Sequence, residues 1–137
     1  MIASVNDIFS DHQVSSASDL IAISRRGVQA RRLSDVMEFT GMSNKELAAA
    51  LPISERQLIR YAKDHLLKPE VTERLISITE LYLFGYDLFQ DHLSFQRWMR
   101  TSNIAAGDVV PITLLDTNHG IQMVRNILGR IQHGVHS

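Results

Sequence analysis

Apolar residues recur at intervals of three or four positions along most of this chain, and that spacing predicts helices. The longest run covers Glu70–Phe89, where the apolar positions are Val71, Leu75, Ile78, Leu81 or Tyr82, Phe84 and Leu88. A second run, about Gly120–Gln132, carries Ile121, Val124, Leu128 and Ile131 on one stripe. Strand-like alternation is nearly absent, so we expect an all-α fold. Because glycine costs about 1 kcal/mol relative to alanine in a helix, we expect the longer helix to bend or break at Gly85.

Shorter helices are expected on both sides of the long one, and turn-forming residues set their ends. The expected ranges are Ser4–Asp11, Ser18–Gly27 and Ala30–Thr40 before it, and Ser94–Thr101 after it. Gly27 and Gly41 can adopt the left-handed conformation that ends many helices. Pro69 suits the first turn of the long helix, where its missing N–H would have had no partner. The pattern predicts a helical bundle.

The stretch Ser43–Asp64 has the spacing of a helix-turn-helix. Its apolar positions flank a short turn: Leu47, Ala48, Leu51, Ile53, Leu58 and Tyr61. Pro52 ends the first helix, because proline disfavours the helical conformation in Leu51 before it. Ser54 can cap the second helix, with Gln57 three residues on as in a capping box.

Such a motif places the outward residues of its second helix against base edges in a major groove. The residues that we expect to contact DNA are Lys45, Ser54, Glu55, Arg56, Gln57, Arg60 and Lys63. Arg56 and Gln57 would read bases, while Lys45, Arg60 and Lys63 would hold phosphates. A purely structural role is the alternative, since this turn carries Pro52 where such motifs usually place glycine, and proline cannot adopt a positive φ.

The charge distribution favours DNA binding. The formal net charge is −1, but Arg25 to Lys68 hold nine basic and five acidic residues, a local balance of +4. A basic segment around a helix-turn-helix suits contact with phosphates, and a homodimer would double the charge presented to DNA. Alternatively, Arg25, Arg26, Arg31 and Arg32 simply form a solvated surface.

Composition and motifs exclude several other classes. The chain has no cysteine, which excludes disulfides and thiolate metal sites and fits a reducing, cytoplasmic location. No apolar run approaches the roughly twenty residues of a membrane span, and Met1–Val14 lacks the basic residues of a signal peptide. None of the six histidines has a metal-binding spacing, and no catalytic or cofactor-binding motif is present. We expect a non-enzyme without catalytic residues, metal or cofactor.

The segment from Ser94 to Gly134 resembles the toxin-binding domain of the Xre-type antitoxins that partner RES-domain toxins. The family pattern has an aromatic residue, a tryptophan, an asparagine-containing loop, a proline, two leucines and a helix led by glycine. The matching residues are Phe95, Trp98, Met99, Asn103, Gly107, Pro111, Leu114, Leu115, Thr117, Gly120, Val124, Leu128, Ile131 and Gly134. From about Ser18 to Gly134, the chain fits the layout of an Xre-like helical domain followed by this module.

The resemblance implies a division of labour along the chain. Residues 1–68 would form the DNA-binding domain, and residues 69–137 the toxin-binding or dimerisation module. The protein would neutralise a RES-domain toxin, a class taken to consume NAD, and would repress its own operon as a homodimer on double-stranded operator DNA. The alternatives are a stand-alone regulator whose C-terminal module only dimerises, and an adaptor that does not bind DNA.

Within the C-terminal module, core and partner-binding residues can be separated. We expect Phe95, Trp98, Leu114, Leu115, Val124 and Leu128 to be core, with Trp98 as its anchor. The expected toxin contacts lie on the exposed face of the last helix and in a flexible tail after Gly134: Arg125, Arg130, Gln132, His133, Gly134, Val135, His136 and Ser137. The tail would occlude the entrance to the toxin's active site.

Overall fold

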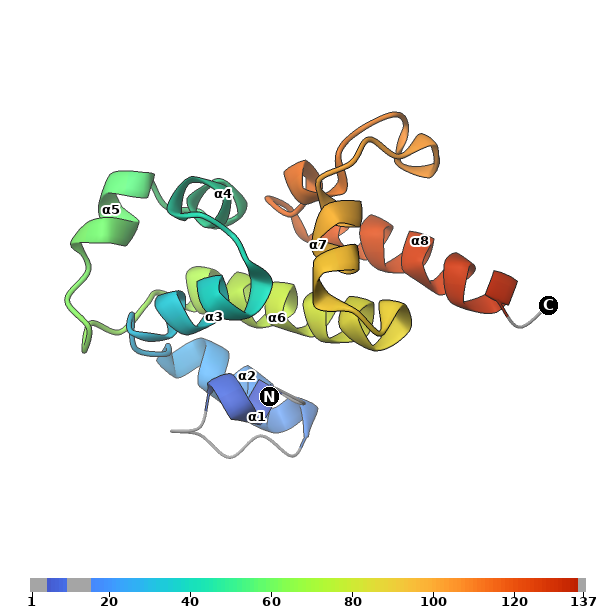
Figure 1. Ribbon diagram of the computed structural model, residues 1–137. Helices are drawn as coiled ribbons and strands as arrows, with labels where there is room; N and C mark the ends of the chain where they lie inside the picture. The colour runs from blue at the N-terminus through green and yellow to red at the C-terminus, as the bar shows by residue number, and fades with distance from the viewer. Residues whose placement is uncertain (1–4, 10–15, 136–137) are drawn as a thin grey trace.

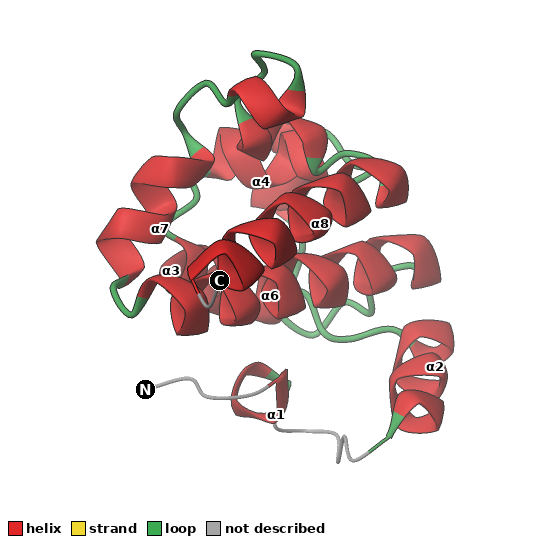
Figure 2. Cartoon of the chain, turned by 90° about the vertical axis from the view of Figure 1, so that its right-hand side faces the viewer, coloured by secondary structure: helices red, strands yellow, loops and turns green. Residues whose placement is uncertain are grey.

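The computed structural model describes residues 5–9 and 16–135, and within them the protein is built from helices (Figures 1 and 2). The α-helices are α1 (Val5–Ile8), α2 (Ala17–Arg26), α3 (Arg32–Thr40), α4 (Asn44–Ala50), α5 (Glu55–Arg60), α6 (Pro69–Phe89), α7 (His92–Met99) and α8 (Asn118–Val135). Two short 3₁₀ turns, η1 (Ile104–Ala106) and η2 (Pro111–Leu114), precede α8. Extended pairing in this part of the chain is limited to isolated bridges. The expected all-α fold is confirmed.

Helix α6 is the centre of the bundle and packs against α2, α3, α7 and α8 (Figure 1). It continues through Gly85, so the expected break at this glycine is wrong. A Cβ at Gly85 would overlap the ring of Phe95, which is fully buried. The glycine is therefore a close-approach site for α7. The hydroxyl of Tyr86 on α6 also donates a hydrogen bond of 2.6 Å to the carbonyl of Phe39 on α3.

Several helix ends lie where turn chemistry placed them, and others are shifted by a few residues. Gly27 (φ 89°) and Gly41 (φ 74°) end α2 and α3 as expected. Helix α2 begins earlier than expected because Ser16, not Ser18, accepts the capping hydrogen bond from the Asp19 amide. Of the helix expected at Ser4–Asp11, the structure describes Val5–Ile8 as helical, and both expected ends lie outside the described residues.

One hydrophobic core joins residues from both sides of the predicted domain boundary after Lys68. Leu47 of α4, Leu75 of α6 and Leu115 before α8 are each fully buried in it. Arg74 of α6 also joins the two halves. Its guanidinium donates to the Ala50 carbonyl at 3.0 Å and to the Asp116 carbonyl. Because the two halves share one core, the division into residues 1–68 and 69–137 concerns function, and it stays a prediction.

The predicted core of the C-terminal module is correct except for its anchor. Phe95, Leu115, Val124 and Leu128 are fully buried, and Leu114 is partly buried against them. Trp98 is only partly buried, with its ring stacked on Phe95 at a centroid distance of 6.0 Å. The anchor is Phe95, because it faces α6 at Gly85 while Trp98 covers it from outside.

Candidate DNA-binding face and partner-binding groove

Helices α4 and α5 form the helix-turn-helix, and each begins at a capping serine. The Ser43 hydroxyl accepts from the Glu46 amide at 3.1 Å while the Glu46 carboxylate accepts from the Ser43 amide at 3.0 Å, a complete capping box. The predicted cap at Ser54 is confirmed, since its hydroxyl accepts from the Gln57 amide at 3.0 Å. The complete box, however, lies on α4 and not on α5.

Pro52 is accommodated by a tight turn that needs no glycine. Leu51 is extended (φ −102°, ψ 154°), as expected for a residue before proline. The Ile53 amide donates to the Leu51 carbonyl at 2.8 Å, so the chain reverses over three residues centred on Pro52. An inverse γ-turn has a central φ near −75°, which proline adopts readily.

Burial of Leu58 sets the rotation of α5. This leucine is 6% exposed, so its side of the helix faces the core. Arg56 and Arg60 are two residues before and after it, and at about 100° per residue both lie roughly opposite Leu58. Both are exposed, as are Ser54, Glu55 and Gln57. Arg56 and Arg60 therefore share the side of the second helix that faces away from the core, and Gln57 is exposed at the edge of this side.

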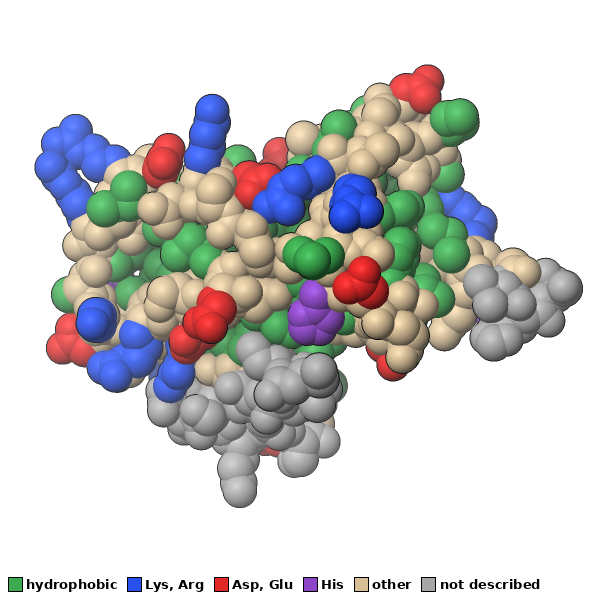
Figure 3. Space-filling view, in the orientation of Figure 1, with side chains coloured by type: hydrophobic (Ala, Val, Ile, Leu, Met, Phe, Trp, Pro, Cys, Tyr) green, Lys and Arg blue, Asp and Glu red, His purple; other side chains and the backbone are tan. Residues whose placement is uncertain are grey.

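Backbone pairing brings a further cation to this face. The Arg31 amide donates to the Lys63 carbonyl at 3.0 Å, and the Ala30 amide to the His65 carbonyl at 2.8 Å. Arg31, Lys63, Asn44 and Ile59 border one surface hollow beside α5. Lysine and arginine side chains project at this end of the molecule in Figure 3. Lys45, on the first turn of α4, is likewise exposed.

The sequence does not indicate Asn44 or Ile59, which also line this hollow. Asn44 lies at the start of α4, and Ile59 is 61% exposed on α5 between the two arginines. An isoleucine is usually expected in the core, so the sequence gives no signal that Ile59 is exposed. The sequence does not decide whether Arg31 belongs to the basic segment that contacts phosphates or to a solvated surface. Only the backbone pairing with the segment after α5 places Arg31 beside Lys63.

The capping carboxylate of α4 also binds α7. The Arg100 guanidinium donates to both Glu46 oxygens, at 2.8 and 2.9 Å, and to the Gly41 carbonyl at 2.8 Å. The hydrogen bonds from Arg100, together with those from Ser43, lower the pKa of Glu46 to about 2 against partial burial. Glu46 is therefore a fixed anion between the helix-turn-helix and the C-terminal half.

Those of the predicted toxin-contacting residues that the structure describes lie on α8, and three of them line a groove beside α6. The groove is lined by Phe84, Gln122, Arg125, Asn126, Gly129, Arg130 and His133. The Arg125 guanidinium lies 5.1 Å from the centre of the Phe84 ring, a cation–π contact. Figure 2 shows α6 and α8 lying side by side. Gln132 is partly buried and is not among the groove residues.

The expected tail is shorter than the sequence suggested. Helix α8 extends to Val135, so Gly134 and Val135 belong to its last turn, and a tail beginning after Gly134 is wrong. Gly134 is exposed. His136 and Ser137 lie outside the described residues. Helix formation continues past Gly134 because the Ile121–Ile131 stripe holds α8 on the core, with Val124 and Leu128 fully buried.

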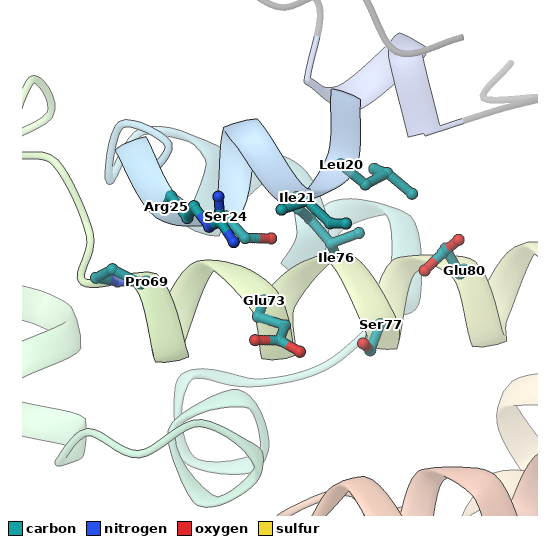
Figure 4. A pocket seen from close by; sticks show the side chains of 9 residues that line it. All are labelled: Leu20, Ile21, Ser24, Arg25, Pro69, Glu73, Ile76, Ser77 and Glu80. Carbon is teal, nitrogen blue, oxygen red and sulfur yellow. The ribbon is translucent and has the colours of Figure 1, made fainter. Parts of the chain in front are cut away.

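A second hollow, which the sequence did not indicate, lies between α2 and α6. Its lining residues are Leu20, Ile21, Ser24, Arg25, Pro69, Glu73, Ile76, Ser77 and Glu80 (Figure 4). Ile21 is 51% exposed on α2 and lies over buried Ile76 of α6. Burial raises the pKa of the Glu80 carboxyl at its edge. Arg25, Glu73 and Glu80 give this hollow both positive and negative charge, so it does not extend the basic surface beside α5.

The loop between α7 and α8 presents an apolar side chain at its tip. Ile104 is 87% exposed. Asn103 fixes the loop beneath it, because its side-chain oxygen accepts from the Ala105 amide at 2.8 Å and its carbonyl accepts from the Asp108 amide at 2.9 Å. A fixed, exposed isoleucine is a candidate partner contact that no periodicity would reveal, since it lies in a turn.

Two other features are absent from residues 5–9 and 16–135. In that part of the chain no three histidine, aspartate or glutamate side chains gather where they could hold a metal ion. Nor does any helix described there have the length and apolar content needed to cross a membrane.

Comparison with known families matches two domains in the order found in the structure. The antitoxin Xre-like helix-turn-helix domain matches residues 19–79. The antitoxin Xre/MbcA/ParS C-terminal toxin-binding domain matches residues 85–134. A comparison with curated proteins finds no match. The first match ends and the second begins within α6, the helix around which both halves pack.

Proposed function

This chain is an Xre-type antitoxin, and we propose that it neutralises a RES-domain, NAD-consuming toxin and represses its own operon. The observation that carries the proposal is the presence of an antitoxin helix-turn-helix and a toxin-binding domain on one core. Their candidate contact surfaces, α5 and the end of α8, lie at opposite ends of the molecule (Figure 1). One copy can therefore hold DNA and toxin at the same time.

The proposed DNA contacts use the exposed side of α5 and the cations beside it. Arg56 and Gln57 would hydrogen-bond to base edges, since arginine reads guanine and glutamine reads adenine in the major groove. Ser54 and Glu55 lie at the same end of α5. Lys45, Arg60 and Lys63 would bind phosphates, which position the protein without reading sequence. The exposure of all these side chains supports this assignment.

A homodimer is part of the proposal because one motif reads only a short half-site. Two copies would place their α5 helices in successive major grooves, about 34–36 Å apart along the DNA. The shared core supports such an arrangement, because Leu58 of α5 is buried in the same core as residues of α6 and α8. The operator would then have two related half-sites.

The proposed toxin-binding residues are six residues of α8 and the two that follow it in the sequence: Arg125, Arg130, Gln132, His133, Gly134, Val135, His136 and Ser137. Arg125, Arg130 and His133 line the α6–α8 groove, which supports their assignment. Occupation of the toxin's active-site entrance by this end of the protein would block access of NAD. No catalytic group is needed on the antitoxin for this mechanism, and we propose that the chain is not an enzyme.

Co-expression of the chain with the product of the neighbouring reading frame tests the proposal. We expect the tagged antitoxin to retain a RES-domain protein in a pull-down and to restore growth of cells that express it. The purified antitoxin should shift a DNA fragment from its own promoter but not a scrambled fragment. Promoter binding without any toxin complex would favour the stand-alone regulator instead.

A further inference from the structure

Of the four glycines within α6 and α8, Gly85 and Gly120 are explained by internal packing, whereas Gly129, in the middle of α8, and Gly134, in its last turn, are not. A Cβ at Gly85 would overlap the Phe95 ring, and one at Gly120 would overlap the Leu114 carbonyl oxygen. A Cβ at Gly129 would meet no atom within 4 Å. Glycine is the poorest helix former after proline. Its use in the middle of α8 therefore weakens the helix without serving any contact within the protein.

Gly129 is one of the residues that line the α6–α8 groove. Gln122, Arg125, Gly129 and His133 follow one another at intervals of three or four residues, so together with Asn126 beside Arg125 they form one stripe of α8. Phe84 of α6 forms the opposite wall. This stripe is distinct from the buried stripe of Val124 and Leu128. The missing side chain leaves the helix backbone accessible where the groove is lined by long polar residues.

The groove is suited to an anionic ligand. Its lining contains the side chains of Arg125, Arg130 and His133 and no carboxylate. The cation–π contact with Phe84 orients Arg125 across the groove. Glu80 of α6, one turn before Phe84, interacts electrostatically with Arg125, but it lines the hollow between α2 and α6 and not this groove. Guanidinium groups bind carboxylates through paired, charge-assisted hydrogen bonds.

We propose that an acidic segment of the toxin crosses α8 at Gly129, with its backbone against the glycine and its carboxylates on Arg125 and Arg130. The inference rests on the proposed antitoxin function and specifies which chemistry the toxin presents to it. Gly129 permits the close approach, because any side chain there would hold the partner backbone away from the helix. His133, one turn further along the stripe, supplies an additional N–H donor.

The substitution Gly129→Ala separates this role from a structural one, because its two effects have opposite signs. Alanine should raise the melting temperature of the free antitoxin by a few degrees, since it favours the helix and meets only open space. The same methyl should weaken the complex with the toxin by about tenfold or more, as expected for overpacking in a close interface. Gly129→Gln should weaken it further.

The measurement uses the full-length antitoxin and the toxin recovered by co-expression, with circular dichroism for stability and titration calorimetry for affinity. Arg125→Gln and Arg130→Gln should each weaken binding and reduce its dependence on salt. Met123→Ala, which alters an exposed residue of α8 outside the groove, is the control and should leave affinity unchanged. Wild-type affinity in Gly129→Ala would overturn the proposal, whereas no binding by the wild type would overturn the antitoxin function itself.

Discussion

The Glu46 carboxylate caps the first helix of the helix-turn-helix and at the same time forms an ion pair with Arg100, 2.8 Å away at the end of α7. The two residues are 54 positions apart in sequence and come from the two matched domains. Because both oxygens of Glu46 accept from Arg100, the pair fixes the position of α4 relative to the C-terminal half. The DNA-binding motif is therefore held against the toxin-binding module by a specific polar contact.

This pair makes stability dependent on pH in a defined window. The folded pKa of Glu46 is about 2, below its ordinary value of 4.5. The stabilisation is therefore complete above pH 4.5 and is lost as the pH falls toward 2. Glu46→Gln, which retains an oxygen for the Ser43 amide, should cost about 1 kcal/mol at pH 7 and almost nothing near pH 2. Urea unfolding at both pH values measures this, and an equal cost at both would contradict it.

Phe95 should contribute more to stability than Trp98. Truncation of fully buried Phe95 to alanine should cost about 3–5 kcal/mol, since it leaves a cavity between α6 and α7. Trp98→Ala should cost only about 1–2 kcal/mol, because solvent already reaches one side of the ring. Thermal and urea unfolding compare the two, and Leu93→Ala, 65% exposed on α7, is the control with little expected effect. A larger loss for Trp98→Ala would restore it as the anchor.

Gly85→Ala should destabilise the protein although alanine is the better helix former. The added methyl would overlap the Phe95 ring, and both helices would have to separate. Overpacking of this kind costs about 1–3 kcal/mol, more than the roughly 1 kcal/mol gained in helix propensity. Asp87→Ala, exposed on the same helix, should change stability by less than about 0.5 kcal/mol. A rise in melting temperature for Gly85→Ala would show that α7 adapts to the methyl.

Arg56 and Arg60 should affect DNA binding in different ways. Arg56→Ala should lose about 1–3 kcal/mol of discrimination against altered operator bases, while Arg60→Ala should weaken binding to all sequences and lower the salt dependence by about one unit. Electrophoretic mobility shifts over a range of salt concentrations separate the two effects. Arg97→Ala, exposed on α7, controls for the loss of one charge. Unchanged operator affinity in both variants would show that α5 does not enter the groove.

DNA binding and toxin neutralisation should be separable by mutation. Deletion of Gln132–Ser137 removes the end of α8 but leaves fully buried Val124 and Leu128, so folding and operator binding should survive. Protection of cells that express the toxin should be weakened or lost. Arg56→Ala should do the reverse, with protection intact and repression released. Full protection by the truncated protein would assign neutralisation to the groove around Arg125 instead.

Local patterns in the sequence were sufficient for the all-α class, the helix-turn-helix and most helix ends. Leu58, Ser54 and Gly41 act through neighbours three or four residues away, and such short-range physics can be read from spacing. The same holds for the buried stripe of α8. Of the candidate DNA-contacting residues, Arg56 and Arg60 follow from this spacing, because the side of α5 opposite Leu58 must face solvent.

Contacts between distant segments were decided only by the tertiary structure. Gly85 is a site of close approach because Phe95 packs on it, and Trp98 is only partly buried because Phe95 occupies that position. Arg100 and Glu46 can form an ion pair only because the fold brings the end of α7 close to the start of α4. The α6–α8 groove likewise needs two helices to meet. Periodicity along one helix specifies which side is buried, but not which helix covers it, because that depends on how all the helices share one core.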